Sequence, residues 1–193
     1  MSFAPVDPAG TPSVSIVVPT YNERENILRL IPQLAEAFRG RACEIIVVDD
    51  SSPDGTGATV STLARTYPGV RLVTKPDKEG IGAALRVGYD QAQGGIIASC
   101  DADLAFDAQD LVRLVDAVAA GDDLVVGSRH IGGASYEAVA WRVRCKRVIS
   151  QAGNTIVRMV FGMPVHDVSA NCRAIRSYAR MLWMRRNEQA YPW

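Results

Sequence analysis

The chain has 193 residues, of which 48% are hydrophobic and 22% charged, so it is long enough for one substantial core and too short for two. No apolar run approaches the roughly 18 residues of a membrane-spanning helix, so we expect no segment that crosses a bilayer. The formal net charge is zero, but residues 1–137 carry 11 basic and 19 acidic side chains, a net charge of −8, and residues 138–193 carry 10 and 2, a net charge of +8. This division indicates an anionic partner for the basic part, either a membrane surface or a phosphate-bearing substrate; the alternative is that the basic part packs on the acidic half.

Residues 1–12 contain three prolines and no apolar run, and are expected to form a flexible lead-in. Short runs rich in Val and Ile then alternate with segments whose apolar residues recur every three or four positions. The strands are expected at 14–18, 44–48, 70–74, 95–99 and 123–127. The helices are expected at about 23–38, 57–66, 81–92 and 108–120. This alternation predicts an α/β core over residues 13–137, with a mostly parallel sheet and helices on both faces.

The pattern changes beyond Gly133, where a helix from about Val139 to Phe161 and a second from about Ala174 to Arg186 are predicted. Residues 138–193 therefore form a basic helical appendage in this interpretation. Basic residues interleaved with apolar and aromatic ones are typical of helices that lie at the headgroup level of a membrane. The same mixture suits nucleic acid, but no recognised nucleic-acid module is present, so we expect no nucleic-acid partner.

The four cysteines, Cys43, Cys100, Cys145 and Cys172, are far apart in the sequence. None has the close spacing of a zinc site. This favours reduced thiols in a cytoplasmic protein.

Two carboxylates, Asp101 and Asp103, come directly after an expected apolar strand. Ligands of open parallel sheets bind beyond the carboxyl ends of the strands. A hard divalent cation with oxygen ligands would relieve the repulsion between the two carboxylates and could bridge a diphosphate. A solvated acidic turn is the alternative if this motif is taken alone.

A second acidic segment follows the strand at 44–48. Asp49 ends that strand, and its carboxylate can accept hydrogen bonds from a nucleobase. For Asp50 and Asp54 we expect capping of the turn and helix that follow.

Several motifs in this order and spacing resemble one known family. They are VVPTYNEREN at 17–26, VVDDSSPDGT at 47–56, KEGIGAALRVGY at 78–89, DAD at 101–103, DLVVGSR at 123–129 and DVSANCRAIR at 167–176. Together, over about residues 13–180, the chain resembles inverting glycosyltransferases of the family 2 type with the GT-A fold. It is most similar to the dolichyl-phosphate (polyprenyl-phosphate) mannosyltransferases among them.

The resemblance implies a nucleotide-sugar donor, GDP-mannose or a UDP-hexose, across the rim of the sheet. Pro19, Tyr21 and Glu23 would surround the nucleoside, and Asp49 would hold the base. The motif Asp101-Ala102-Asp103 would bind the diphosphate with Mg²⁺ or Mn²⁺. Arg129 would meet a phosphate, for which a planar bidentate donor is well shaped. Asp101, Asp103 and Arg129 are therefore the expected catalytic residues.

The resemblance further implies a polyprenyl or dolichyl phosphate acceptor, at the cytoplasmic face of a membrane to which the protein binds peripherally. A membrane-anchored partner subunit is compatible with this placement. The expected acceptor-phosphate contacts are Arg142, Lys146, Arg147 and Arg173. An ionised phosphate needs no protein base, because its second pKa is about 6.

Two alternatives remain. Transfer to a sugar hydroxyl would need a positioned carboxylate, for which Asp167 is the candidate catalytic base. A catalytically idle nucleotide-sugar-binding or membrane-adaptor domain is the other.

The sequence departs from the resembling branch in two places. DVSANCR stands where Asp-Val-Thr-Ser-Gly-Phe-Arg is usual, so that Ala170, Asn171 and Cys172 replace Ser-Gly-Phe. Members of the branch also continue beyond the position that corresponds to Trp193, so we expect this chain to be a shortened version.

Overall fold

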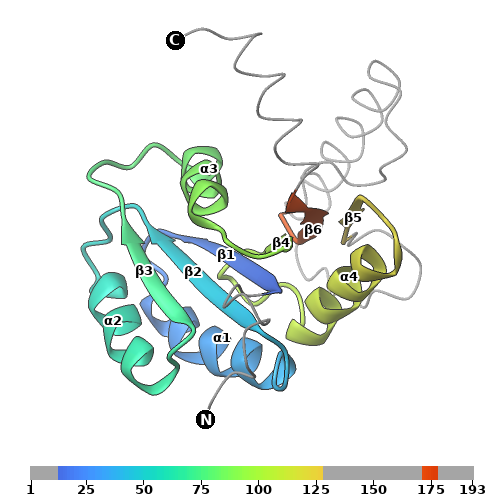
Figure 1. The fold of residues 1–193 in the computed structure, drawn as a ribbon. Helices are drawn as coiled ribbons and strands as arrows, with labels where there is room; N and C mark the ends of the chain where they lie inside the picture. Colours follow the sequence, from blue (N-terminus) through green and yellow to red (C-terminus); the bar gives the residue numbers. More distant parts are fainter. Residues whose placement is uncertain (1–12, 128–170, 178–193) are drawn as a thin grey trace, which may run out of the picture.

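The computed structural model describes residues 13–127 and 171–177, and these form a six-stranded sheet with helices on both faces (Figure 1). The strand order is β3-β2-β1-β4-β6-β5. Strands β1 to β4 are parallel, whereas β6 runs antiparallel to both of its neighbours. The strands are β1 (Val14–Thr20), β2 (Cys43–Asp49), β3 (Val70–Thr74), β4 (Ile96–Ser99), β5 (Leu124–Val126) and β6 (Arg173–Arg176).

Four described helices divide between the two faces of the sheet. Their bounds are α1 (Arg24–Ala37), α2 (Thr56–Thr66), α3 (Ile81–Gln91) and α4 (Ala108–Ala120). Helices α1, α2 and α4 pack on one face and share the larger apolar core, while α3 alone covers the other face and forms a smaller core with it (Figure 1). The predicted α/β fold, with a mostly parallel sheet and helices on both faces, is confirmed.

The two central strands explain why the elements were visible in the sequence. Every residue of β1 and β2 is buried, as expected for parallel strands that are covered on both faces. Their side chains alternate between the cores: Val47 lies in the larger core and Val48 in the smaller one. The parallel register sets Thr20 beside Asp49, so that the polar ends of β1 and β2 meet at the same edge of the sheet.

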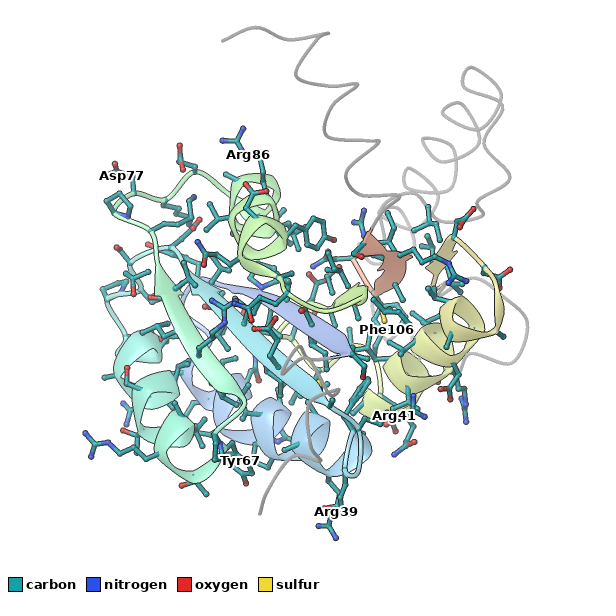
Figure 2. The ribbon with its side chains drawn as sticks, viewed as in Figure 1. Arg39, Arg41, Tyr67, Asp77, Arg86 and Phe106 are labelled. Atoms are coloured by element: carbon teal, nitrogen blue, oxygen red, sulfur yellow. The ribbon has the colours of Figure 1, made fainter. Side chains whose placement is uncertain are left out.

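Helix α4 is held at its N-terminus and again in its second half. Asp107 caps its N-terminus by accepting a hydrogen bond from the backbone N–H of Gln109 at 2.9 Å. Arg41, in the turn before β2, donates to Asp116 of α4 at 2.6 Å (Figure 2). Phe106, in the loop before α4, packs against the larger core (Figure 2). The loop that carries Asp101 and Asp103 is thereby fixed between two anchored elements.

The predicted helix from about Ala174 is wrong at its start, because Arg173–Arg176 form strand β6. This strand lies between β4 and β5, where backbone pairing on both sides overrides the local helical pattern. The sheet therefore includes residues from the segment that the sequence assigned to the appendage. The predicted helix at 139–161 and the rest of the second helix lie outside the described residues. Within the described part of the chain, no helix combines the length and apolarity needed to cross a membrane.

Candidate functional site

The carboxyl ends of β1, β2 and β4 meet the N-terminus of α3 around a pocket of about 320 Å³. The pocket is lined by six of the residues that the sequence assigned to nucleotide-sugar binding, namely Pro19, Tyr21, Glu23, Asp101, Ala102 and Asp103. They come from positions up to 84 residues apart in the chain. A further six lining residues are Thr20, Asp50, Lys78, Gly80, Ile81 and Ala84.

The two carboxylates of the DAD motif both face the pocket. Asp101 Oδ1 accepts a hydrogen bond from Asn171 Nδ2 at 2.9 Å, and Asp103 Oδ1 accepts one from the backbone N–H of Ala105 at 3.0 Å. In the described segments no three His, Cys, Asp or Glu side chains come close enough to form a complete metal cage. Two hard oxygen donors fit a cation such as Mg²⁺ or Mn²⁺ that takes its other ligands from water and a substrate diphosphate.

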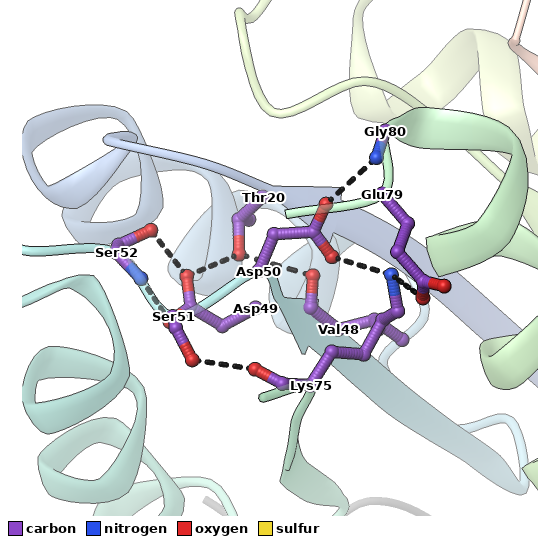
Figure 3. Close-up of polar contacts among 9 residues, drawn as sticks. All are labelled: Thr20, Val48, Asp49, Asp50, Ser51, Ser52, Lys75, Glu79 and Gly80. Atoms are coloured by element: carbon purple, nitrogen blue, oxygen red, sulfur yellow. Dashed lines mark hydrogen bonds and ion pairs between the residues drawn. The ribbon is translucent and has the colours of Figure 1, made fainter. Parts of the chain in front are cut away.

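Asp49 and Asp50 are adjacent in the chain but face different surroundings (Figure 3). The carboxylate of Asp49, 2% exposed, accepts hydrogen bonds from Thr20 Oγ1 at 3.1 Å and from the backbone N–H of Ser52 at 3.0 Å. The Ser52 hydroxyl also donates to it. Asp49 is not among the residues that line the pocket. These contacts give it a role in holding the loop after β2, and its predicted contact with the base stays a prediction.

Asp50 does line the pocket, although the sequence assigned it only a capping role. Its Oδ1 accepts a hydrogen bond from Lys75 Nζ at 3.1 Å, and its Oδ2 accepts one from the backbone N–H of Gly80 at 3.2 Å (Figure 3). Lys75 also pairs with Glu79 at 2.8 Å. Burial lowers the pKa of Lys75, but its bonds to Glu79 and Asp50 outweigh burial and raise the pKa above its usual value. This ion pair ties β2 to the start of α3.

Three loops at the rim each contain a residue with a left-handed backbone. Asn22, Ser51 and Leu104 have φ angles of 58°, 54° and 59°, and they are the non-glycine residues with positive φ in the described ranges. Asn tolerates this conformation, whereas for a bulky Leu it is uncommon. Leu104 directly follows the DAD motif. Strain of this kind concentrates at binding sites and marks the three loops as specialised.

The described lining of the pocket carries more negative than positive charge. Among the described residues that line it, Glu23, Asp50, Asp101 and Asp103 carry carboxylates and Lys78 carries an ammonium group, and the charge of Asp50 is paired with that of Lys75. Lys78 Nζ lies 3.5 Å from the centroid of the Tyr21 ring, a cation–π contact between the loop after β1 and the loop before α3. An anionic ligand would be repelled from such a pocket unless a cation accompanied it.

The remaining predicted site residues are only partly covered by the structure. Arg129, Asp167, Arg142, Lys146 and Arg147 lie outside the described residues. Arg173 lies in β6, opposite Ser99 of β4. Its Nε is buried and is the one buried side-chain nitrogen or oxygen in the described part of the chain without a hydrogen-bond partner.

Residues that the prediction of the site from sequence missed include Asp50, Lys75 and Asn171. The alternation of side chains along β2 could have found Asp50, since Val48 and Asp50 must face the same side of the sheet. The contacts that link Lys75 to Asp50 and Asn171 to Asp101 join residues 25 and 70 positions apart, so no local pattern could predict them.

Residues 15–180 match the family described as Glycosyl transferase family 2. The polyprenol monophosphomannose synthase of Mycolicibacterium smegmatis is 38% identical over 165 residues, which are 83% of this chain and 60% of that protein. The undecaprenyl-phosphate mannosyltransferase of Micrococcus luteus is 34% identical over 172 residues, 85% of this chain and 66% of that protein. The chain thus spans roughly three fifths to two thirds of the length of these curated relatives.

A solved structure with the same fold is glucosyl-3-phosphoglycerate synthase from Mycobacterium tuberculosis, in complex with Mn²⁺, uridine diphosphate and glucosyl-3-phosphoglycerate. Its TM-score is 0.65 and its sequence identity 21%, and the match covers 86% of this chain and 57% of that one. At this identity the likeness establishes the fold alone.

Proposed function

Because the chain belongs to glycosyl transferase family 2, we propose that it transfers a hexose, which we take to be mannose, from a nucleotide-sugar to a polyprenyl phosphate with inversion. The observation that carries this proposal is the pocket where six predicted donor residues meet at the carboxyl edge of the sheet. The names of the two relatives support the choice of a mannosyl donor and a lipid-phosphate acceptor.

Asp101 and Asp103 are proposed to hold Mg²⁺ or Mn²⁺ together with the donor diphosphate. When bound, the cation offsets the negative charge that develops on the departing nucleoside diphosphate. The acidity of the described lining supports this requirement, since a diphosphate there would otherwise face the carboxylates of Glu23, Asp101 and Asp103. An oxygen of the acceptor phosphate would form the new bond to the anomeric carbon while the bond from that carbon to the diphosphate breaks. The acceptor phosphate is already ionised near neutral pH and needs no base.

The base is proposed to contact Asp50, with Asp49 as the alternative that the sequence favoured. Asp50 faces the pocket, and a carboxylate has about four acceptor positions, of which Lys75 and Gly80 use two. Changing each residue to Asn separates the two assignments. Asp50→Asn should weaken nucleotide binding by about 1.5–3 kcal/mol, as expected for a charge-assisted bond, and should also lower the melting temperature, because it breaks the buried pair with Lys75, so nucleotide affinity is the deciding measurement. Asp49→Asn should lower the melting temperature and leave affinity near the wild-type value. If Asp49→Asn weakens nucleotide binding and Asp50→Asn does not, the contact with the base belongs to Asp49.

The metal and the donor are tested together by calorimetry with GDP-mannose and UDP-glucose, each with Mn²⁺ and with EDTA. We expect GDP-mannose to bind more tightly in Mn²⁺, and Asp103→Ala to remove the Mn²⁺-dependent part while the protein stays folded. Transfer of labelled mannose to undecaprenyl phosphate would then be measured. Label on a sugar hydroxyl instead would favour the alternative acceptor with Asp167 as base. Binding without any transfer would favour a donor-binding domain.

The acceptor side is proposed to involve the basic region and Arg173. The buried, unpartnered Nε of Arg173 supports a phosphate near β6, because a buried donor without a partner is energetically unfavourable. Peripheral attachment to the cytoplasmic face of a membrane is part of the same proposal. Sedimentation with phosphatidylglycerol vesicles should show binding that weakens with salt. Changing Arg144 and Arg147 to Glu should weaken it further without affecting donor affinity. Vesicle binding that changes neither with salt nor with the change of Arg144 and Arg147 to Glu would argue against a lipid-phosphate acceptor.

A further inference from the structure

A chain of buried and partly buried hydrogen bonds leads from α3 to the DAD motif. The Tyr89 hydroxyl lies 3.0 Å from Ser99 Oγ, which donates to Asn171, whose side-chain oxygen and backbone oxygen lie 3.3 and 2.9 Å away. Asn171 Nδ2 then donates to Asp101 Oδ1 at 2.9 Å. The chain therefore ends on one of the two carboxylates that face the pocket.

The contacts on both sides determine how the amide of Asn171 is oriented. Its Nδ2 must face Asp101, because an amide oxygen in that place would repel the carboxylate. Its Oδ1 then faces Ser99, which has a proton to donate. Asn171 is 4% exposed, so neither end of the amide exchanges its partner freely with water. The side chain has one satisfied orientation.

The backbone register supports the same placement. Ile96 pairs with Arg176 and Ser99 with Arg173 in the antiparallel ladder of β4 and β6. Two more steps along this register set Asp101 opposite Asn171. Both residues lie just beyond the paired ends of β4 and β6, so the position of β6 in the sheet brings the two side chains together.

We infer that Asn171 is a positioning residue for Asp101, and this inference rests on the proposed function. Asn171 holds one oxygen of the carboxylate and thereby keeps the group turned toward the pocket before any ligand arrives. An amide donor does this without adding a charge of its own. Hydrogen bonds to metal-ligating carboxylates typically change metal affinity by about 10–100-fold when they are lost.

A purely structural role would be to join β6 to β4, and two substitutions separate it from positioning. Asn171→Gly removes the amide but keeps the backbone carbonyl that accepts from Ser99. Asn171→Asp keeps the shape and the acceptor toward Ser99 but replaces the donor to Asp101 with a second negative charge. Tyr89→Phe is the matched control, because it removes one hydroxyl at the other end of the same chain and leaves the contact with Asp101 intact.

The experiment titrates GDP and UDP into the whole protein, once with Mn²⁺ and once with EDTA, and records the melting temperature of each variant. We expect Asn171→Gly to lose about tenfold of the Mn²⁺-dependent affinity and Asn171→Asp more, up to about 100-fold. Affinity in EDTA should be unchanged in both. Tyr89→Phe should keep the wild-type response to Mn²⁺ even if it melts at a lower temperature.

Two results would overturn the inference, and they are distinguishable. If the wild type binds no more tightly in Mn²⁺ than in EDTA, the proposed metal function fails and the inference fails with it. If the wild type responds to Mn²⁺ and both Asn171 variants respond equally, only the inference fails. A parallel loss of affinity in Mn²⁺ and in EDTA would assign Asn171 a structural role and would also refute positioning. If Asn171→Asp does not fold, Asn171→Gly decides the question.

Discussion

Replacing Gly88 with Ala should destabilise the protein, although alanine is the better helix former. Gly88 lies in α3, where the helix backbone rests against β1 and β2. A Cβ added there would lie 2.3 Å from Val17 Cγ1 and 3.1 Å from Val48 Cγ2. Both valines are fully buried and, being β-branched, have little freedom to rotate away. The helix itself must therefore shift away from the sheet.

The expected size of the effect follows from two opposing terms. Exchanging Gly for Ala within a helix gains about 1 kcal/mol. The clash with Val17 is about 1 Å closer than ordinary carbon–carbon contact, which places the overpacking penalty near the upper end of its range, about 3 kcal/mol. The net loss is about 2 kcal/mol. For a domain of this size the melting temperature should fall by about 4–8 °C.

Gly82 of the same helix is the matched control. It is exposed, and an added Cβ would meet nothing within 4 Å. Gly82→Ala should therefore keep only the gain, up to about 1 kcal/mol, and raise the melting temperature by about 2–4 °C. Urea and thermal unfolding followed by circular dichroism would measure both. If Gly88→Ala is as stable as Gly82→Ala, the close approach of α3 to the sheet is not what the structure indicates.

Two further predictions concern the described residues. Asp54 accepts hydrogen bonds from the backbone N–H groups of Thr56 and Arg24, so Asp54→Ala should cost about 1 kcal/mol at pH 7. Burial raises the pKa of Asp54, but the bonds from Thr56 and Arg24 outweigh it and lower the pKa, so this stabilisation is present above pH 4 or so and is lost in more acidic solution. Urea unfolding at pH 7 and pH 3.5 should show the difference from wild type shrinking; a constant difference would contradict the role of the charge. Burial raises the pKa of the Cys43 thiol to about 12, so iodoacetamide at pH 8 should label Cys43 only after unfolding, as read by peptide mass spectrometry. Equal labelling of folded and unfolded protein would refute its burial.

The alternating helices and strands could be predicted because buried parallel strands are almost continuous runs of Val and Ile. The predictions for β3 and α4 agree with the structure at both ends, and the other predicted strands and helices within residues 13–127 deviate by one or two residues at one or both ends. Strand β6 could not be predicted in this way. Its four residues include two arginines, and its partners lie some 50 to 80 positions earlier in the chain. The local pattern was helical, and only pairing in the sheet makes it a strand.

The residues of the site, too, could be predicted only where the local sequence determines their position. The DAD motif and the loop after β1 could be assigned from sequence because they follow recognisable strand ends. Choosing between Asp49 and Asp50 required knowing which face of the sheet each side chain points to. Val47 and Val48 lie in different cores, which puts Asp50 on the side of α3, where the pocket opens. The partner of Asp101 could not be foreseen, since Asn171 reaches it only through the register of β6.

The position of β6 also has a consequence for how the protein is made. During translation, β1 to β4 and their helices emerge from the ribosome well before residues 171–176 are synthesised. In this interval one edge of β4 is unpaired and β5 lacks its neighbour in the sheet. An open apolar edge is a template for pairing with other chains, and closing a contact across 70 residues is slow. We therefore expect the nascent chain to be most vulnerable to aggregation in the interval after β4 and before β6, and a chaperone that shields the β4 edge to raise the yield of folded protein. The contact that completes the surroundings of Asp101 would be among the last to form.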